Sequence, residues 1–122
     1  MPSLELRSER VALRELTAQD LPVLLRVLSD PSVGRWWGTY DEERVRREYT
    51  DPEDTTVFLI EAGGEIAGMI QYSEETEEDY RHAGIDIALV SGQQGRGLGP
   101  EAIRVLARHL FEERGHHRLT ID

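Results

Sequence analysis

Cysteine, lysine and asparagine are all absent from this sequence of 122 residues. Without cysteine, the chain can form no disulfide, no zinc–thiolate centre and no thiol nucleophile. No apolar run approaches the roughly 20 residues that a membrane helix needs, and the N-terminal residues lack the basic and apolar regions of a secretion signal. The four histidines do not have the spacing of metal ligands. We therefore expect a cytoplasmic protein that binds no metal and enters no membrane.

Positive charge is scarce relative to negative charge. All 14 basic side chains are arginine, and the chain has 24 acidic residues, so the formal net charge is −10. Nucleic acid is therefore not expected as a partner, because backbone phosphates must be met by cations. The acidic residues are densest in the ranges 41–54 and 74–79. These ranges form either solvated surface, the commoner case, or a surface that attracts cationic substrates.

The length and the apolar patterning predict one α/β domain that spans residues 1–122. Alternation of apolar and polar residues predicts strands at residues 4–7, 11–16, 55–61, 66–73, 83–90 and 118–122. Helical spacing and capping residues predict helices at residues 21–28, 41–49 and from the glycine-rich stretch to about residue 114. A loop with Val33, Trp36 and Trp37 separates the first two helices. The last helix lies between two strands that should be parallel, which makes a mixed central sheet with flanking helices.

Residues 94–99 read Gln-Gly-Arg-Gly-Leu-Gly and are called the glycine turn below. A predicted strand precedes this turn and a predicted helix follows it. The first N–H groups of a helix have no intrahelical partner, and the helix dipole favours an anion there. Glycine also lets backbone approach a ligand without interference from a Cβ. The spacing differs from that of dinucleotide-binding loops, and no Gly-Lys-Ser/Thr of a triphosphate loop is present.

The glycine turn resembles the pyrophosphate motif of the GCN5-related N-acetyltransferases (the GNAT superfamily). In that motif a Gln or Arg is followed by two residues, a Gly, one residue, and a Gly or Ala; Gln94, Gly97 and Gly99 occupy these positions. The order of predicted elements agrees with the family along nearly the whole chain. Three shorter stretches are similar to the aminoglycoside 6′-N-acetyltransferase branch: Trp36-Trp37-Gly38, Gly84-Ile85-Asp86 and Thr120-Ile121-Asp122. Siderophore-pathway acetyltransferases also carry a Trp-Trp pair, so the pair does not identify a substrate.

This resemblance implies that acetyl-coenzyme A binds in a V-shaped gap between the strands at 83–90 and 118–122. Pantetheine would pair with backbone near residues 87–90, as in β-augmentation, and pyrophosphate would bind backbone N–H groups of the glycine turn. The N–H of Leu89 would polarise the thioester carbonyl. The residues implied in cofactor binding are Ile87, Ala88, Leu89, Val90, Gln94, Gly95, Arg96, Gly97, Leu98 and Gly99.

Asp86 is the predicted base that removes a proton from the attacking amine. Strand alternation places it on one face with Gly84 and Ala88, and these small neighbours leave room for a ligand. The alternative is a solvent-facing or salt-bridged aspartate. Trp36 and Trp37 are predicted to line the substrate pocket, with one ring in the core and Trp37 nearer the substrate; simple core packing is the alternative. Asp122 matches an aspartate that contacts the acceptor in the aminoglycoside branch.

The resemblance therefore predicts an N-acetyltransferase that uses acetyl-coenzyme A and a small cationic amine such as an aminoglycoside. The family continues beyond this point with an asparagine-rich loop, a helix that carries a tyrosine general acid, and two closing strands. This sequence ends at Asp122 and lacks them. We therefore expect a C-terminally short domain, which is either a truncated gene product or a domain whose open sheet edge pairs with a second copy or another chain. The alternative function is a catalytically silent module that binds an acyl-coenzyme A or a partner protein.

Overall fold

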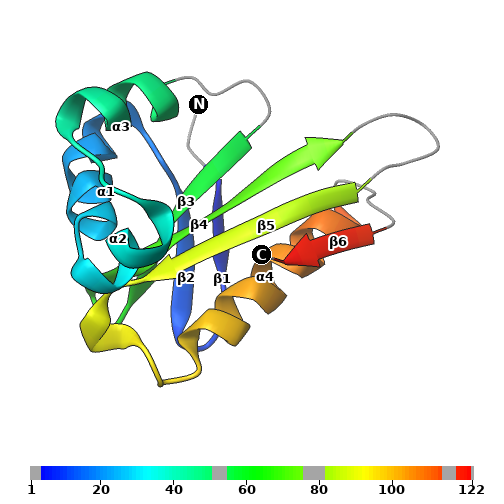
Figure 1. Ribbon diagram of the computed structural model, residues 1–122. Coiled ribbons are helices and arrows are strands. Elements are labelled where there is room, and N and C mark those ends of the chain that lie inside the picture. The colour runs from blue at the N-terminus through cyan, green and yellow to red at the C-terminus, as the bar shows by residue number, and fades with distance from the viewer. Residues whose placement is uncertain (1–3, 51–54, 76–81, 114–117, 122) are drawn as a thin grey trace.

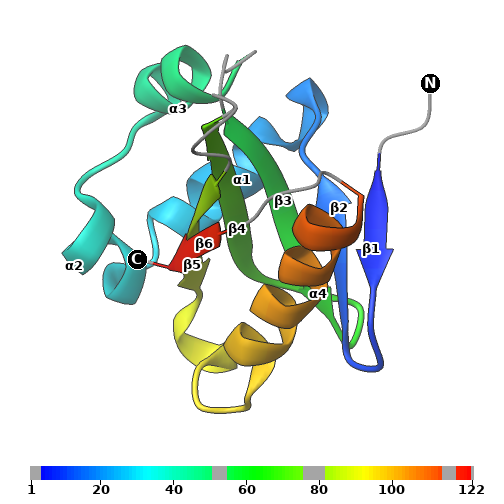
Figure 2. The same ribbon diagram turned by 90° about the vertical axis from the view of Figure 1, so that its right-hand side faces the viewer.

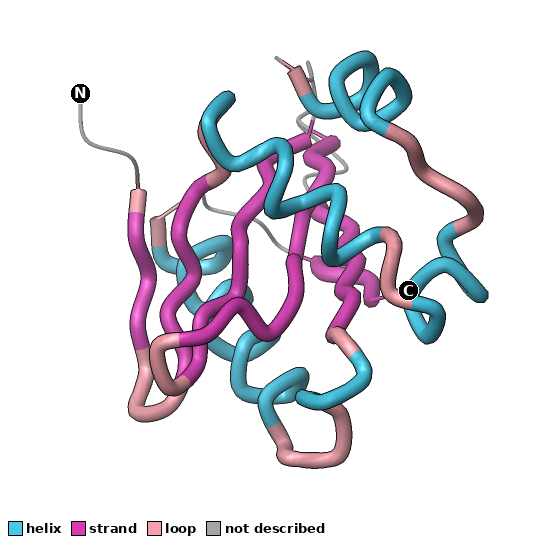
Figure 3. Tube along the Cα trace, turned by 90° about the vertical axis from the view of Figure 1, so that its left-hand side faces the viewer, coloured by secondary structure: helices cyan, strands magenta, loops and turns pink. Residues whose placement is uncertain are grey.

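A computed structural model describes residues 4–50, 55–75, 82–113 and 118–121. Its centre is a six-stranded sheet in which the strands lie side by side in chain order, from β1 to β6. β5 and β6 are parallel, as predicted, and every other neighbouring pair is antiparallel. Figure 3 shows β1 at one edge of this sheet. The strands are Glu5–Arg7 (β1), Val11–Glu15 (β2), Thr55–Ala62 (β3), Glu65–Glu75 (β4), His82–Leu89 (β5) and Arg118–Ile121 (β6).

Helices cover both faces of the sheet (Figures 1 and 2). Helices α1, α2 and α3 gather on one face, and α4 lies on the other. Their bounds are Leu21–Leu28 (α1), Pro31–Trp37 (α2), Glu42–Tyr49 (α3) and Leu98–Glu112 (α4), with short 3-10 turns at Ala18–Asp20 (η1) and Ser91–Gln93 (η2). The predicted α/β class with a mixed sheet and flanking helices is therefore confirmed.

Each face of the sheet has its own apolar core. On the α4 side, Phe58, Ile70 and Ile85 pack against the apolar stripe of the helix, which includes Leu106. On the other side, residues of β3 and β4 pack against α1 and its neighbours, with Leu59 fully buried. Alternate residues of each strand supply the two cores, because successive side chains point to opposite faces.

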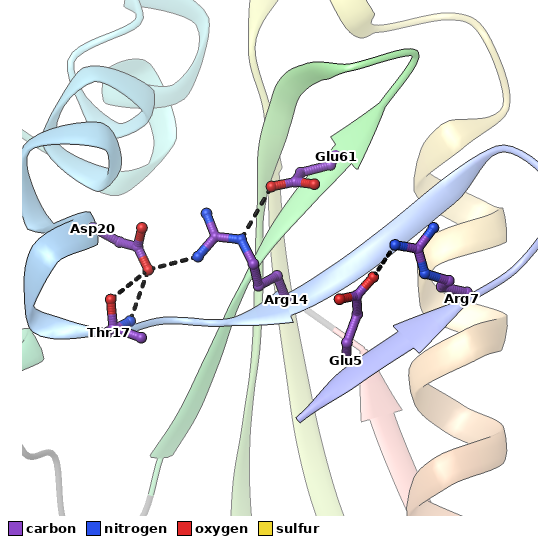
Figure 4. Close-up of polar contacts among 6 residues, drawn as sticks. All are labelled: Glu5, Arg7, Arg14, Thr17, Asp20 and Glu61. Carbon is purple, nitrogen blue, oxygen red and sulfur yellow. Dashed lines mark hydrogen bonds and ion pairs between the residues drawn. The ribbon is translucent and has the colours of Figure 1, made fainter. Parts of the chain in front are cut away.

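Polar contacts fix the chain where it leaves the sheet for α1 (Figure 4). The guanidinium of Arg14 in β2 donates to Asp20 at 2.8 Å and to Glu61 of β3 at 3.1 Å. Asp20 in turn accepts from the backbone N–H and the hydroxyl of Thr17, both at 2.9 Å. One arginine therefore joins two strands to the turn from which α1 begins.

The prediction of a loop around Val33, Trp36 and Trp37 was wrong, because these residues lie in α2. Asp30 caps this helix by accepting from the backbone N–H of Ser32 at 3.0 Å, and Pro31 occupies its first position. Asp-Pro does end α1, as predicted, but the same two residues also start a new helix, since proline is favoured in a first turn. The acidic run was also predicted as a loop; its first two glutamates belong to β4, and residues 76–81 lie outside the described residues.

A second polar cluster joins the β1–β2 turn to the first turn of α4. The carboxylate of Glu101 accepts from the Arg10 guanidinium at 2.7 Å, from the Arg10 backbone N–H at 2.9 Å and from the hydroxyl of Ser8. These donors, the Ser8 hydroxyl first, lower the pKa of Glu101 to about 2. Glu101 is nearly buried, with 8% of its surface exposed, so its charge depends on these partners.

The strands β4 and β5 approach each other closely at Gly68, beside a β-bulge that adds one residue to β4. A Cβ on Gly68 would lie 2.0 Å from the carbonyl oxygen of Ala88.

We predict that Gly68→Ala lowers the free energy of unfolding by about 3 kcal/mol, because backbone must move to admit the methyl group. Urea denaturation measures this change. In the control variant Gly92→Ala the methyl group meets nothing within 4 Å, so stability should stay within about 0.5 kcal/mol; equal losses in both would contradict the close approach.

Glu101→Gln should destabilise the protein at neutral pH because it removes the charge that Ser8 and Arg10 bind. A depressed pKa stabilises the folded state above the ordinary value of 4.5, and this stabilisation is lost as the pH falls toward about 2. The difference between wild type and variant, measured by urea denaturation, should therefore shrink over this range. Glu43→Gln, on the exposed surface of α3, is the control for loss of one charge. A difference that does not vary with pH would contradict the account.

Candidate active site

A cleft of about 800 Å³ lies between α2 and the C-terminal half of β5. Asp86 lines it together with Leu89, Gln94 and both tryptophans of α2. Asp86 faces the α2 side because Ile85, Ile87 and Leu89 point into the opposite core, as strand alternation predicts. The Gln71 side chain donates to the Asp86 carboxylate at 3.4 Å from the neighbouring strand. The buried carbonyl oxygen of the Gln71 side chain has no partner among the described residues.

The backbone of β5 is open at one edge beside this cleft. β6 pairs with β5 only from His82 to Ile85, and residues 86–89 pair with no other described strand on that side (Figure 1). The N–H of Val90 donates to Ala67 of β4 at 2.9 Å. Since N–H directions alternate along a strand, the N–H groups of Ile87 and Leu89 point to the open edge. The cofactor gap predicted between β5 and β6 stays a prediction, because β6 is described only to Ile121, the partner of Ile85.

The glycine turn continues from this open edge to α4. Gly95 and Gly97 have φ angles of 78° and 77°, a left-handed conformation that favours glycine. Gly97 is the residue before α4, and the first N–H groups of a helix have no intrahelical partner. The turn thus presents backbone donors beside the N-terminus of α4, where an anion is favoured. Gly99 differs from the other two glycines: it is buried, and its Cβ would meet Leu89 at 3.5 Å, so it permits close helix packing.

Two side chains hold the glycine turn from opposite sides. Arg10 donates to the carbonyl oxygens of Arg96 at 2.8 Å and Gly97 at 3.3 Å. On the other side, the Gln94 amide donates to the carbonyl oxygen of Leu89 at 2.9 Å and to the hydroxyl of Ser32 at 2.8 Å. Arg10 was missed from the sequence because no spacing pattern links it to a turn 86 residues away. The side chain of Arg96 is exposed, and its predicted role in phosphate binding stays a prediction.

The two tryptophans of α2 are arranged in the reverse of the predicted order. Trp37 packs against the core beside α1, whereas Trp36 is 81% exposed. The guanidinium of Arg35 lies 5.7 Å from the centre of the Trp36 ring. Both rings line the cleft, so Trp36 provides an exposed aromatic surface and Trp37 a partly buried one.

Some predicted features lie outside the described residues. Asp122 and residues 76–81 of the acidic run are among them. Within the described ranges, no group of three His, Asp or Glu side chains is placed to hold a metal ion. No helix in these ranges is long and apolar enough to cross a membrane.

This chain is similar in structure to several solved acetyltransferases over most of its length. A structure of AAC(6′)-Ib in complex with paromomycin and acetyl-coenzyme A is 28% identical in sequence, with a TM-score of 0.83 over 93% of this chain and 73% of that chain. RimL, a ribosomal L7/L12 alpha-N-protein acetyltransferase, is 18% identical with a TM-score of 0.81 over 98% of this chain and 71% of that chain. A ribosomal-protein-alanine N-acetyltransferase from Brucella melitensis biovar Abortus 2308 is 19% identical, with a TM-score of 0.76 over 93% and 80% of the two chains. The last two show a shared fold only.

The family assignment comes from the sequence itself. No curated protein matches the chain significantly. The model of the GNAT acetyltransferase domain matches residues 10–122, which is nearly the whole sequence. The resemblance and the fold expected from it are thereby confirmed. The chain belongs to the GNAT acetyltransferase family.

Proposed function

We propose that this protein transfers the acetyl group of acetyl-coenzyme A to a primary amine of a small cationic molecule. The observation that carries the proposal is the continuity of two sets of backbone donors. The N–H groups at the open edge of β5 are followed along the chain by the glycine turn at the N-terminus of α4, and Leu89 and Gln94 line the same cleft as Asp86. A pyrophosphate and an extended amide-containing arm fit these donors in that order.

The residues present fit acetyl-coenzyme A through backbone rather than through side chains. Residues 94–99 would hold the pyrophosphate with their N–H groups, and the left-handed glycines keep Cβ atoms away from it. The N–H of Ile87 would pair with the pantetheine arm. The N–H of Leu89 would donate to the carbonyl oxygen of the thioester, where negative charge develops during attack by the amine. Bound there, acetyl-coenzyme A supplies the activated acetyl group.

Asp86 is the proposed base. A protonated amine has no lone pair for attack, so a carboxylate within reach of the acceptor must take its proton, directly or through water. Asp86 lines the cleft that Leu89 also lines, which would bring base and thioester donor to one acceptor. The hydrogen bond from Gln71 would orient its carboxylate.

The acceptor we propose is an aminoglycoside. Three observations support this class: the 28% identity to AAC(6′)-Ib, whose structure contains paromomycin, the carboxylate in the cleft, and the aromatic surface of Trp36. An aromatic face and a carboxylate together suit a polycationic sugar. The acidic surface of a chain with net charge −10 would also attract such a molecule.

Binding of acetyl-coenzyme A by Gly97→Val tests the cofactor site. A branched Cβ is strained at a φ of 77° and would lie beside the Arg10 guanidinium, at 3.2 Å. We expect affinity to fall at least about tenfold, or ~1.4 kcal/mol, by isothermal titration calorimetry. Gly63→Val is the matched control, because it has a similarly positive φ of 60° in the distant β3–β4 turn. Equal affinity in all three proteins, or no binding to folded wild type, would overturn the proposed site.

Asp86→Asn should lower kcat by about 10²- to 10⁴-fold, the usual contribution of a general base. The affinity for acetyl-coenzyme A should change little, because the proposed cofactor contacts are backbone groups. The assay is release of free thiol from acetyl-coenzyme A with a panel of amines that includes paromomycin. Asp41→Asn on the exposed start of α3 is the control for loss of a carboxylate. An Asp86→Asn enzyme with the wild-type pH–rate profile would exclude Asp86 as the base, and wild type without turnover would favour a silent binding module.

A further inference from the structure

A chain of hydrogen bonds links α2 to the glycine turn. The carboxylate of Asp30 accepts from the hydroxyl of Ser91 at 2.7 Å and from its backbone N–H at 3.2 Å. The same carboxylate accepts from the hydroxyl and the backbone N–H of Ser32, at 2.7 and 3.0 Å. Asp30 therefore caps α2 and, at the same time, bonds the residue that follows β5 and Val90.

Gln94 completes this chain from the side of the glycine turn. One N–H of its amide donates to Ser32 and the other to the carbonyl oxygen of Leu89. Ser32 has a single hydroxyl hydrogen, which goes to Asp30, so its oxygen is free to accept from Gln94. The donors and acceptors balance, and the network runs without a break from the open edge of β5 to the first turn of α2.

Apart from these hydrogen bonds, helix α2 is held mainly by Val33 and Trp37, which pack on the core. It has seven residues, Pro31 to Trp37, and only Val33 is fully buried. So short a helix is unstable in isolation and depends on its caps and tertiary contacts. The helix nevertheless carries Trp36 and Trp37, which line the cleft opposite Asp86. The placement of these rings therefore depends on what ties the start of α2 to the sheet.

We infer that Asp30 and Ser91 are positioning residues that fix the place of helix α2, which carries both tryptophans, relative to the glycine turn. The position of Trp36 and Trp37 in the cleft, where the acceptor amine would bind, would then depend on the turn that binds the cofactor. The expected effect on catalysis rests on the proposed function. The expected effect on the position of α2 does not depend on it. Asp30 and Ser91 are not among the residues that line the cleft, whereas Ser32 and Gln94, through which they act, do line it.

The charge of Asp30 makes the link persistent. The hydroxyl of Ser91, followed by that of Ser32, lowers the pKa of Asp30 to about 2. The carboxylate is therefore ionised throughout the neutral and mildly acidic range. Hydrogen bonds to an ionised acceptor are stronger than those between neutral groups. Protonation of Asp30 should therefore not weaken the link between α2 and the turn at neutral or mildly acidic pH.

Ser91→Ala provides the sharpest test because it removes the hydroxyl bond to Asp30, the shorter of the two Ser91 contacts, and leaves the cap of α2, from Asp30 to Ser32, in place. Trp36 and Trp37 are the only tryptophans of the chain, so tryptophan emission reports α2 directly. In the free protein we expect a red-shifted emission, lower anisotropy and stronger acrylamide quenching. Ser91→Thr keeps the hydroxyl and should behave as wild type. Ser73→Ala, which removes an exposed hydroxyl bond to Thr55 at 3.2 Å, is the matched control.

Kinetics separate positioning from simple stabilisation. With an amine that wild type acetylates, Ser91→Ala should raise the KM for the amine by about 2- to 10-fold, the equivalent of one hydrogen bond, and change the Kd of acetyl-coenzyme A less than about twofold. A lower denaturation midpoint with unchanged tryptophan signals and amine KM would overturn the inference. If wild type binds no acetyl-coenzyme A, the proposed function fails, and the spectroscopic comparison in the free protein alone decides the inference.

Discussion

The site depends on the open edge of β5, where the backbone of residues 86–89 pairs with no other described strand on one side. β4 pairs with the whole of β5, whereas β6 pairs only from His82 to Ile85. Backbone donors beyond that point face outward, and a strand edge of this kind accepts another extended chain. Everything else in the site is arranged around the end of this strand. Asp86 lies on its α2-facing side, the glycine turn follows it, and α2 forms the opposite wall of the cleft.

Two polar systems hold the end of this strand in shape. Glu101 fixes Arg10, and Arg10 holds the glycine turn by two carbonyl oxygens from the side of α4. Asp30 holds the same region through Ser91 and, by way of Ser32, through Gln94 from the side of α2. Both systems centre on a carboxylate whose pKa is lowered to about 2 by its donors. These contacts use the carbonyl oxygens of Arg96 and Gly97 and the side chain of Gln94, so they hold the turn without engaging its backbone N–H groups.

The sequence was sufficient to predict the fold, because alternation and helical spacing are local and strong in β3, β4, β5 and α4. The facing of Asp86 followed from the same alternation, and the glycine turn from its spacing. Helix α2 was missed because a seven-residue helix has too few apolar positions to show a period, and its stability comes from a cap and tertiary contacts. Arg10 and Glu101 could not be paired from sequence, since they are 91 residues apart and meet only after the sheet and α4 assemble.

The central claim is that backbone at the end of β5 and in the glycine turn binds acetyl-coenzyme A. Amide hydrogen exchange of the full chain, with and without coenzyme A, measures this binding most directly. The account predicts slower exchange at Ile87, Leu89 and residues 94–99 when the ligand is bound, with little change in β1. Binding that leaves these amides unprotected, or that protects the charged groove of about 530 Å³ between β1 and α4 instead, would contradict it.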